Sequence, residues 1–541
     1  MRDVVVVGAG HNALVAACYL AAAGLDVEVV ERDTVVGGAV STVERWPGYA
    51  VDRGSSAHIM VRHTGIPEEL ALHETGLRYL DIDPWGFAPI QGAPGGGITF
   101  RSSVEQTCAS IEAVCGSRDA DAYAGFVATW APRNRRLFRA FDEPPTGRSL
   151  GRALMGVGRG SGLGGAALAH EFLCTGDALL DATFSDERLR TALGWLGAQS
   201  GPPTSEVATA ELVAWNTVLH DIPPGRAVGG SGALSAALAE RLRRSGGSLR
   251  LGDGAASITS GGGRATGVRT ASGEHVAARA VLAGCHVLTT LQLARDGLPP
   301  GLLERAEAYV RVGNGIGMAV RLGTTGLPEY PGAAADSCTG LQLLASSRQQ
   351  LRAAHADFSA GRPPADPAAL AMTFSHLDPS IAPPGRHNVT VWGQWHPHTL
   401  STGERWDDIA VREGDKLIAA LDRAAPGFAS TVEQVHVQTP LDLERELGLL
   451  RGNVMHVEMS LDAMFAFRPL PELAGYRGPL EGLYLTGAST HPGGGVFGAS
   501  GRSAARVLLA DSASGVGRRR VTRTGAGVRR AVAATAAVLR P

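Results

Sequence analysis

Hydrophobic positions near the N-terminus are typical of a parallel α/β fold. Residues 4–7 are four consecutive valines, as expected for a parallel strand buried on both faces. Residues 11–23 are rich in helix formers and stop at Gly24, and residues 27–30 read VEVV, which predicts a second short strand. This order of strand, helix and strand predicts the beginning of a Rossmann-type sheet.

The pattern changes farther along the chain. Residues 76–220 and 301–435 read as helices separated by Pro/Gly-rich loops, for example at 93–97 and 143–147. Near the other end, residues 483–485 read LYL, a short buried strand, before a glycine-rich turn and a further helical segment. We therefore expect a second, α+β region beside the Rossmann-type sheet.

Length and composition narrow the class of protein. The chain has 541 residues, of which 44% are hydrophobic and 19% charged, so we expect a globular protein with more than one core. The net charge of −2 gives no reason to expect a nucleic-acid partner. No apolar run is long enough to span a bilayer, no signal peptide is evident, and the six cysteines form no CxxC pair, so we expect a cytoplasmic protein with reduced thiols.

The turn after the first strand carries a dinucleotide-binding motif. Gly8, Gly10 and Ala13 satisfy G-x-G-x-x-G/A, which combines a tight turn, an open backbone and a small residue that lets the helix lie against the strand. The second strand ends in Glu31, where an acid accepts hydrogen bonds from ribose hydroxyls and repels a 2′-phosphate. Gly37 and Gly38 follow, a second pair that resembles the one flavoproteins place against the FAD pyrophosphate, so we expect FAD.

The C-terminal segment 482–511 is expected to close the same site. After the LYL strand, Gly487 starts a turn that continues through HPGGGV at 491–496, and the amides of these glycines can approach a ligand. The helix behind the turn would direct its N-terminus at the flavin pyrimidine and stabilise negative charge there.

Taken together, these blocks resemble the phytoene desaturase superfamily of FAD-dependent oxidoreductases. Within it, the chain is most similar to the branch of pyridine-nucleotide-disulphide-oxidoreductase-domain proteins, to which GRSAAR after the HPGGG turn points. The resemblance is carried by residues 5–24, 31–56, 229–242 (GGSGALSAALAERL), 439–456 (TPLDLERELGLLRGNVMH), 465–469 (FAFRP) and 485–506.

The resemblance implies an α/β fold with a discontinuous Rossmann-type FAD-binding domain and an α+β substrate domain. It assigns residues 1–75, 221–300 and 436–511 to the FAD domain, 76–220 and 301–435 to the substrate domain, and 512–541 to a basic tail. Residues 248–285 look like a strand, hairpin and strand that return to the FAD sheet. The implied cofactor positions are Gly8, Gly10, Asn12, Ala13, Glu31, Arg32, Gly38, Ala39, Ser56, Ala255, Gly487, Gly495 and Val496.

One departure concerns the ribityl chain. Gly487 and Ala488 stand where many flavoproteins have a Gly-Asp pair, so that contact is expected from backbone or water. Two histidines are candidates for proton transfer, His491 in the glycine-rich turn and His58 in GSSAH, although a structural role remains open for both. No metal site is expected, because neither HPH at 396–398 nor any Glu-His spacing fits one. No GxSxG elbow of a hydrolase occurs.

The resemblance predicts a desaturase, dehydrogenase or redox isomerase for a lipophilic small molecule, with polyunsaturated substrates and secondary metabolism as candidates. Two alternatives stay open: a flavin amine oxidase, disfavoured because the single lysine, Lys416, lies in a helical stretch that looks peripheral, and an inert FAD-binding partner protein. With one Rossmann motif, oxygen or a quinone is expected as electron acceptor. The tail leaves two alternatives open, a disordered segment with no binding role and peripheral contact with a membrane through Arg518, Arg519, Arg520, Arg523, Arg529 and Arg530.

Overall fold

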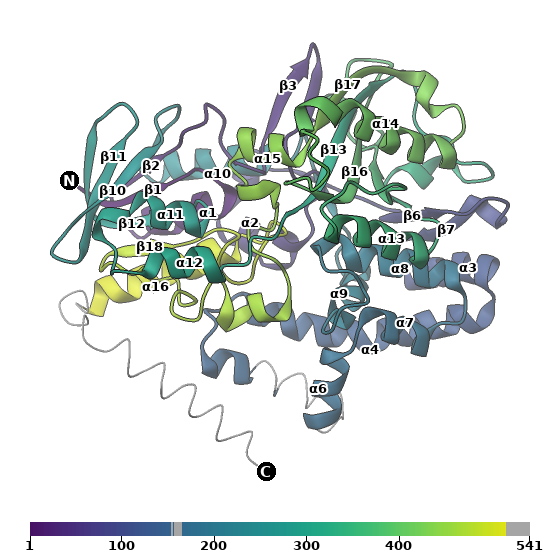
Figure 1. Ribbon diagram of the computed structural model, residues 1–541, viewed down its shortest axis with the longest axis horizontal. Coiled ribbons are helices and arrows are strands. Elements are labelled where there is room, and N and C mark those ends of the chain that lie inside the picture. Colours follow the sequence, from purple (N-terminus) through teal and green to yellow (C-terminus); the bar gives the residue numbers. More distant parts are fainter. Residues whose placement is uncertain (153–154, 156–164, 515–541) are drawn as a thin grey trace.

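The computed structural model describes residues 1–152, 155 and 165–514 (Figure 1). Its first sheet contains seven strands in the order β10-β11-β12-β1-β2-β9, and β18 pairs with β12. Their bounds are Arg2–Val7 (β1), Val27–Val30 (β2), Ser248–Arg250 (β9), Ala255–Gly261 (β10), Arg264–Thr270 (β11), His275–Ala283 (β12) and Leu483–Leu485 (β18). β1 runs parallel to β2 and β12, and β18 runs parallel to β12, as in a Rossmann-type sheet.

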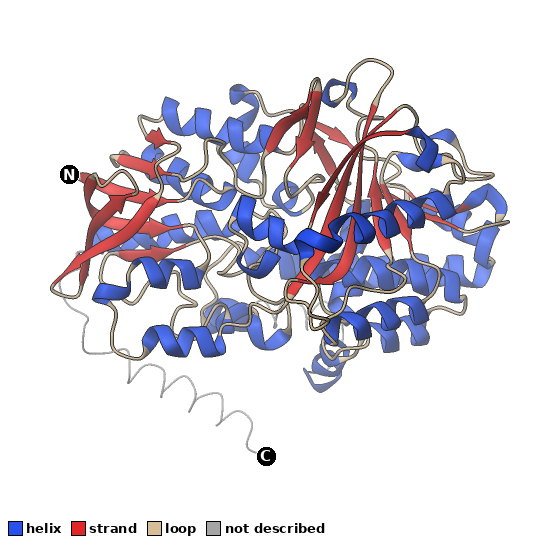
Figure 2. Ribbon diagram, turned by 45° about the horizontal axis from the view of Figure 1, so that its top comes forward, coloured by secondary structure: helices blue, strands red, loops and turns tan. Residues whose placement is uncertain are grey.

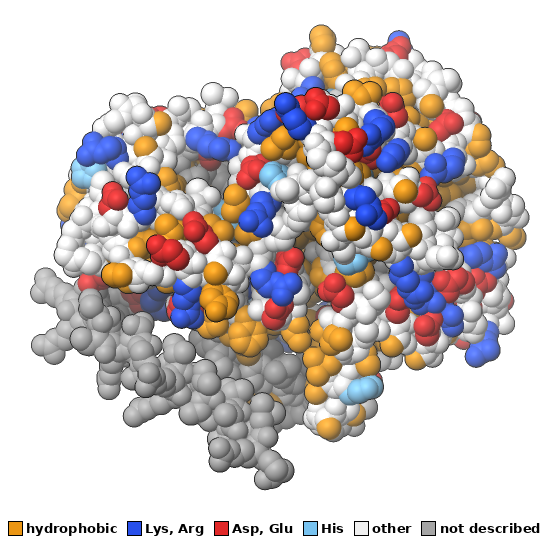
Figure 3. Space-filling model, in the orientation of Figure 1, with side chains coloured by type: hydrophobic (Ala, Val, Ile, Leu, Met, Phe, Trp, Pro, Cys, Tyr) orange, Lys and Arg blue, Asp and Glu red, His pale blue; other side chains and the backbone are white. Residues whose placement is uncertain are grey.

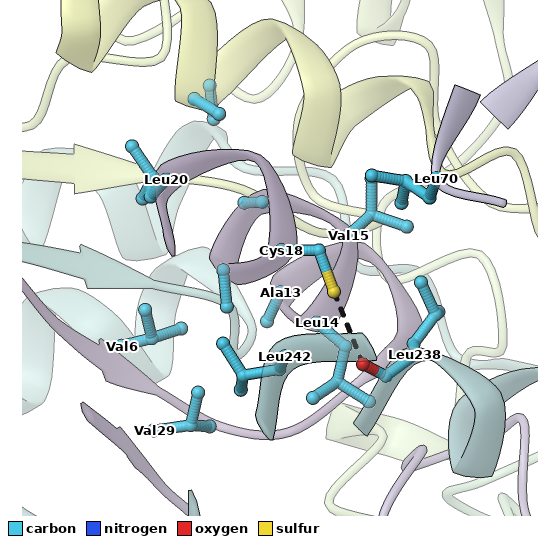
Figure 4. Close-up of a cluster of buried hydrophobic side chains, with 14 of the residues drawn as sticks. Val6, Ala13, Leu14, Val15, Cys18, Leu20, Val29, Leu70, Leu238 and Leu242 are labelled. Atoms are coloured by element: carbon cyan, nitrogen blue, oxygen red, sulfur yellow. Dashed lines mark hydrogen bonds between the residues drawn. The ribbon is translucent and has the colours of Figure 1, made fainter. Parts of the chain in front are cut away.

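The valines of β1 are buried on both faces of this sheet. Val4 and Val6 pack against α1 (His11–Ala22), α10 (Gly232–Arg244) and α16 (Ala499–Ser514), as Figure 4 shows for the cluster around Val6. Val5 and Val7 face the opposite layer, which contains α11 (Val287–Leu293) and α12 (Leu302–Tyr309). This alternation follows from the two-residue period of a strand, and it explains the uninterrupted run of valines.

Small residues bring the elements around α1 into close contact. A Cβ atom on Gly284 would lie 2.6 Å from Cβ of Ala13, the third residue of the glycine motif. On the other side of α1, a Cβ on Gly501 of α16 would lie 2.0 Å from the carbonyl oxygen of Asn12. The GRSAAR segment therefore forms the helix that packs on α1 and holds the N- and C-terminal parts of the chain together.

The second sheet, whose strands are among those drawn in red in Figure 2, has the order β17-β13-β16-β15-β14-β6-β7. Its strands are Gly86–Pro89 (β6), Gly97–Phe100 (β7), Gly315–Thr324 (β13), Leu341–Leu344 (β14), Ala369–Met372 (β15), His387–Pro397 (β16) and Val432–Gln438 (β17). One face packs on α14 (Trp406–Ala424). The other packs on a helical layer of α3 (Val104–Cys115), α4 (Ser117–Phe141), α7 (Gly176–Thr183), α8 (Glu187–Gly197) and α13 (Arg348–Ser359).

Shorter elements complete the described fold. Two antiparallel two-stranded sheets are formed, one by the hairpin of β3 (Thr42–Trp46) and β4 (Tyr49–Asp52), the other by β5 (Tyr79–Asp81) and β8 (Gly225–Ala227), which are far apart in the sequence. The remaining α-helices are α2 (Ile66–Glu69), α6 (Gly165–Leu173), α9 (Ala210–Ala214) and α15 (Pro440–Leu447). No helix in the described ranges combines the length and the hydropathy needed to cross a bilayer.

The mixed α/β fold class is confirmed, and so are the predicted strands at 4–7, 27–30 and 483–485 and the helix that starts at His11. The domain boundaries stay a prediction, and two elements cross them. β17 spans the boundary predicted between residues 435 and 436. The whole strand belongs to the second sheet, where it pairs with β13. α16 continues to Ser514, past the tail boundary predicted after Asp511. Residues 515–541, which contain the arginines of the predicted membrane contact, lie outside the described residues.

Candidate functional site

A cavity of about 1110 Å³ is lined by residues of both sheets. One end lies at the β1–α1 turn and the other lies among α4, α9 and the strands β15 and β16. Ordinary small-molecule pockets have volumes of roughly 300–1,000 Å³. This cavity therefore lies just above the upper end of that range, as suits an extended ligand.

The β1–α1 turn forms a cradle for an anion at the first end. Gly8 adopts φ +89°, in the region that favours glycine, whereas Gly10 has an ordinary φ of −64°. A Cβ on Gly10 would meet nothing within 4 Å, so the protein's own packing does not require glycine there. No side chain caps the N-terminus of α1, whose amides and helix dipole can therefore bind phosphate.

The acid and the second glycine pair lie against this turn. The Glu31 carboxylate accepts hydrogen bonds from the amides of Ala9, at 2.6 Å, and Asp33, at 2.9 Å. The amide of Gly37 donates to the carbonyl of Ala9 at 2.8 Å, and a Cβ on Gly38 would lie 3.7 Å from Cα of Gly10. The segment that contains Glu31 and the segment that contains Gly37 and Gly38 thus contact the β1–α1 turn and form one continuous wall of the cavity with it.

Most of the predicted cofactor residues line this cavity: Gly8, Gly10, Asn12, Ala13, Glu31, Arg32, Gly38, Ala39, Ala255, Gly487, Gly495 and Val496. Asn12 adds an unpartnered polar atom, because its buried Oδ1 accepts no hydrogen bond from any residue that the structure describes. Ser56 is the exception. It lies behind the wall formed by Ser55, and its carbonyl accepts a hydrogen bond from Arg226 at 2.8 Å.

The second end of the cavity is apolar. Its walls come from α4, α6, α9, the strands β15 and β16, and the loop before Arg468, and they include Leu137, Phe138, Phe141, Phe172, Leu212, Trp215, Met372, Trp392, Met464 and Phe465. Three lining residues, Leu173, Leu461 and Phe467, are also among the exposed large hydrophobic residues. Figure 3 shows hydrophobic side chains gathered over α6 and the neighbouring edge of the molecule. An apolar molecule could therefore enter past an apolar rim.

Comparisons with known proteins identify the family. Residues 6–65 match the NAD(P)-binding Rossmann-like domain. Mouse pyridine nucleotide-disulfide oxidoreductase domain-containing protein 2 is 31% identical over 94% of this chain and 93% of its own. Phytoene dehydrogenase of Streptomyces griseus is 28% identical over 91% of this chain and 92% of its own. The chain belongs to the phytoene desaturase superfamily, in the branch of the mouse protein.

Membership of the phytoene desaturase superfamily makes the chain an oxidoreductase. The solved structure of a putrescine oxidase variant has the same fold, with a TM-score of 0.57 and 16% identity over 96% of this chain and 99% of that one. The Rossmann-like match and the phytoene dehydrogenase relative are consistent with a flavin-type cofactor.

Relatives in this superfamily are oxidoreductases. The two histidines predicted for proton transfer nevertheless do not line the cavity. His58 is fully buried, with Nδ1 2.7 Å from the Tyr79 hydroxyl and Nε2 2.8 Å from the Ser231 hydroxyl. His491 is also buried, and its Nε2 lies 3.2 Å from the carbonyl of Ala140. The geometry favours positioning roles for both, so a catalytic role for either would need movement of the wall.

Buried histidines of this kind make stability depend on pH. Burial lowers the pKa of His58 from its usual 6.5 to about 3. Above pH 6.5 the ring is neutral in both states, but at lower pH the unfolded chain binds a proton that the folded protein excludes. The free energy of unfolding should then fall by up to about 1.4 kcal/mol per pH unit from this group.

Urea unfolding between pH 7 and pH 4 measures this effect. In H58Q the decline with acid should be shallower than in the unaltered protein, whereas H275Q, which changes an exposed histidine, should leave the slope as it was. Equal slopes for H58Q and the unaltered protein would contradict the assignment of His58 as a buried neutral ring.

An arginine that the sequence marked only within the FAFRP block anchors the glycine-rich turn. Arg468 is fully buried, and its guanidinium donates to the carbonyls of Met455, Val457, Glu458, Ala463 and Ala488, the Ala488 distance being 2.6 Å from Nη2. It pairs with no carboxylate among the described residues. Burial lowers the pKa of Arg468 to about 9, so the group still carries positive charge at pH 7.

Two more polar residues of the wall have no local sequence signal. Arg321 on β13 donates from Nη1 to the Thr390 hydroxyl at 3.0 Å, while its buried Nε has no hydrogen-bond partner in the described part of the chain. Within the same residues, Glu211 on α9 has both carboxylate oxygens buried and unpartnered. In the described part of the chain, no group of histidine, cysteine and acidic side chains could hold a metal ion.

Proposed function

We propose that this oxidoreductase uses FAD to desaturate, dehydrogenate or redox-isomerise a lipophilic small molecule, with polyunsaturated compounds as candidates. The observation that carries the proposal is a single cavity with a phosphate cradle at one end and apolar, aromatic walls at the other. The relative named phytoene dehydrogenase supports a lipophilic substrate, since phytoene is a hydrocarbon.

The residues present fit FAD. Glu31 and Ala255 would hold the adenosine half, and the amides at the start of α1 with Gly38 and Ala39 would hold the pyrophosphate. Gly487, Gly495 and Val496 line the route toward the apolar end, where the flavin ring would lie. When bound, FAD would supply the capacity to accept a hydride equivalent from the substrate.

The chain's own residues would orient the reactants and exclude water. Phe141 and Phe465 line the cavity, and the ring of His491 packs against them with centroids 5.6 and 5.8 Å away. Arg468 fixes the turn through Ala488 and adds positive charge close to it, which would stabilise negative charge on a reduced cofactor. Oxygen or a quinone would then receive the electrons.

An amine oxidase shares the fold but gains no support from the single lysine. Lys416 lies on α14, with Nζ 2.7 Å from Glu413, and it does not line the cavity. An inert FAD-binding partner protein is the other alternative. It predicts a bound flavin that neither substrates nor electron acceptors change.

The test begins by comparing the lipophilic metabolites of a strain from which the gene has been deleted with those of the parent strain. The identity of the compound that accumulates also shows whether the reaction belongs to secondary metabolism. The accumulated compound is added without air to the FAD-loaded protein. We expect loss of the visible flavin absorbance and its return with a quinone or oxygen. Bleaching by simple amines with release of hydrogen peroxide would favour the amine oxidase, and a flavin that never changes would favour the inert partner.

A lipophilic substrate also motivates contact with a membrane surface. We propose that the basic segment after Ser514, together with the exposed Leu173 and Phe467 at the rim, brings the chain reversibly to anionic bilayers at the cytoplasmic face. The full chain should sediment with liposomes that contain anionic lipid, and a chain ending at Ser514 should sediment less. Equal sedimentation of both chains would contradict a role for the tail.

A further inference from the structure

An acidic side chain interrupts the apolar end of the cavity. Glu211 lies in the first turn of α9, between Ala208 and Trp215, which line the same wall. Both carboxylate oxygens are buried, and neither has a hydrogen-bond partner among the described residues. Leaving such a group unpaired costs about 1–3 kcal/mol, and this makes it a candidate for binding a ligand atom.

Glu211 forms no ion pair with a cation within residues 1–152, 155 and 165–514. Arg133 of α4 is the charged group that acts on it, but Arg133 already forms an ion pair with Glu171 of α6, with Nη1 2.6 Å from Oε2. The ionisable groups on other helices packed against α9 are engaged elsewhere: Asp177 of α7 with Arg352, Glu187 of α8 with Arg348, and His220, which follows Trp215, with Tyr123.

The protonation state follows from this setting. Burial raises the pKa of Glu211 to about 8, so the carboxyl group is mostly protonated at pH 7. A protonated carboxyl group can donate one hydrogen bond, and the neighbouring wall residues Leu173, Leu212 and Trp215 offer no side-chain acceptor for it. Because the carboxyl group has no hydrogen-bond partner among the described residues, an oxygen atom of the molecule in the cavity could serve as its acceptor.

We infer that Glu211 donates a hydrogen bond to an oxygen atom of the bound molecule, so the substrate class is a lipophilic compound that carries a carbonyl, hydroxyl or ether oxygen. The inference rests on the proposed function, since it requires that the apolar end takes a lipophilic molecule. It narrows the substrate class, because a pure hydrocarbon would leave the carboxyl group unpaired. An ammonium group would demand an ionised carboxylate in an apolar wall.

Binding of matched probes tests the inference without turnover. The probes are 2-dodecanone, dodecane and dodecylamine, added to the FAD-loaded full chain and followed by calorimetry and by tryptophan fluorescence, to which Trp215 and Trp392 of the wall contribute. At pH 7 the ratio of the ketone's affinity to the alkane's should be about five- to tenfold higher in the unaltered protein than in E211L, because the hydrogen bond offsets part of the cost of desolvating the ketone. The ketone should lose this advantage as the pH rises through 8, because the donor is then deprotonated.

Variants separate the side chain from the general apolarity of the cavity. E211Q keeps a donor that does not titrate, so its preference for the ketone should persist and become independent of pH. E211L should show a lower ketone-to-alkane affinity ratio that does not depend on pH, and E112L, at an exposed position on α3, should behave like the unaltered protein.

Each outcome has a clear meaning. The same ketone-to-alkane affinity ratio in E211L as in the unaltered protein, or tighter binding of dodecylamine than of the ketone, would overturn the role of Glu211 and leave the lipophilic cavity standing. If neither ketone nor alkane binds, the lipophilic substrate of the proposed function fails, and the inference fails with it.

Discussion

Replacing Gly10 with alanine is expected to weaken FAD binding by about 100-fold or more while the fold stays intact, because the added methyl group would occupy the space that the pyrophosphate needs. The structure has room for it, since nothing lies within 4 Å of a Cβ at Gly10 and its φ of −64° suits any residue. Alanine at this N-cap position should cost under about 1 kcal/mol of stability. Titration of the cofactor-free protein with FAD measures the loss.

Gly125 offers a matched control. It lies on α4, has open space for a Cβ and does not line the cavity, so G125A should bind FAD as the unaltered protein does. Urea unfolding of both cofactor-free variants shows whether either has lost its fold. Full FAD affinity in G10A would mean that no phosphate approaches the β1–α1 turn, and the cradle would then be assigned wrongly.

Replacing Arg468 with methionine is expected to lower the free energy of unfolding by at least about 3 kcal/mol, because several buried carbonyl groups would lose their donor together. These carbonyls belong to the segment 455–463 and to Ala488 in the glycine-rich turn. R468K should recover little, since one ammonium group with three donors cannot match the fork of a guanidinium. Urea unfolding and FAD titration should both report the change.

Arg305 provides the comparison for this loss. Its side chain is exposed and forms a surface ion pair with Glu472 at 3.2 Å, so R305M should cost under about 1 kcal/mol. If R468M proves as stable as R305M and binds FAD normally, the buried guanidinium does not hold the turn.

The cofactor-binding end of the cavity could be predicted from the sequence, because its backbone conformation depends on short local motifs or on sequence blocks that the family shares. The valine run, the spacing of Gly8, Gly10 and Ala13, and the acid after the second strand each require a particular backbone within a few residues. The structure joins these pieces as expected, with Gly37 bonded to Ala9. The helix at 499–514 was also predictable, and its close contact with α1 explains the small residues of its first turn.

The apolar end could not be predicted to the same depth. Glu211 is one of many glutamates in the sequence, and only the packing of α9 against other helices buries its carboxylate on the cavity wall. His58 and His491 were selected for being near the cofactor motifs, yet nearness in sequence did not reveal that their rings point into the packed protein. Arg468 was visible within a family block, but its carbonyl partners come from separate turns that only the fold brings together.

The most direct measurement is an equilibrium titration of the cofactor-free protein with FAD, FMN, NAD⁺ and NADP⁺. The account predicts one FAD per chain, bound far more tightly than the others. FMN lacks the adenosine half that Glu31 and the cradle would hold, Glu31 disfavours the 2′-phosphate of NADP⁺, and NAD⁺ offers no flavin to the turn at 487–496. Tighter binding of NAD⁺ or NADP⁺ than of FAD, or equal binding of FMN and FAD, would contradict it.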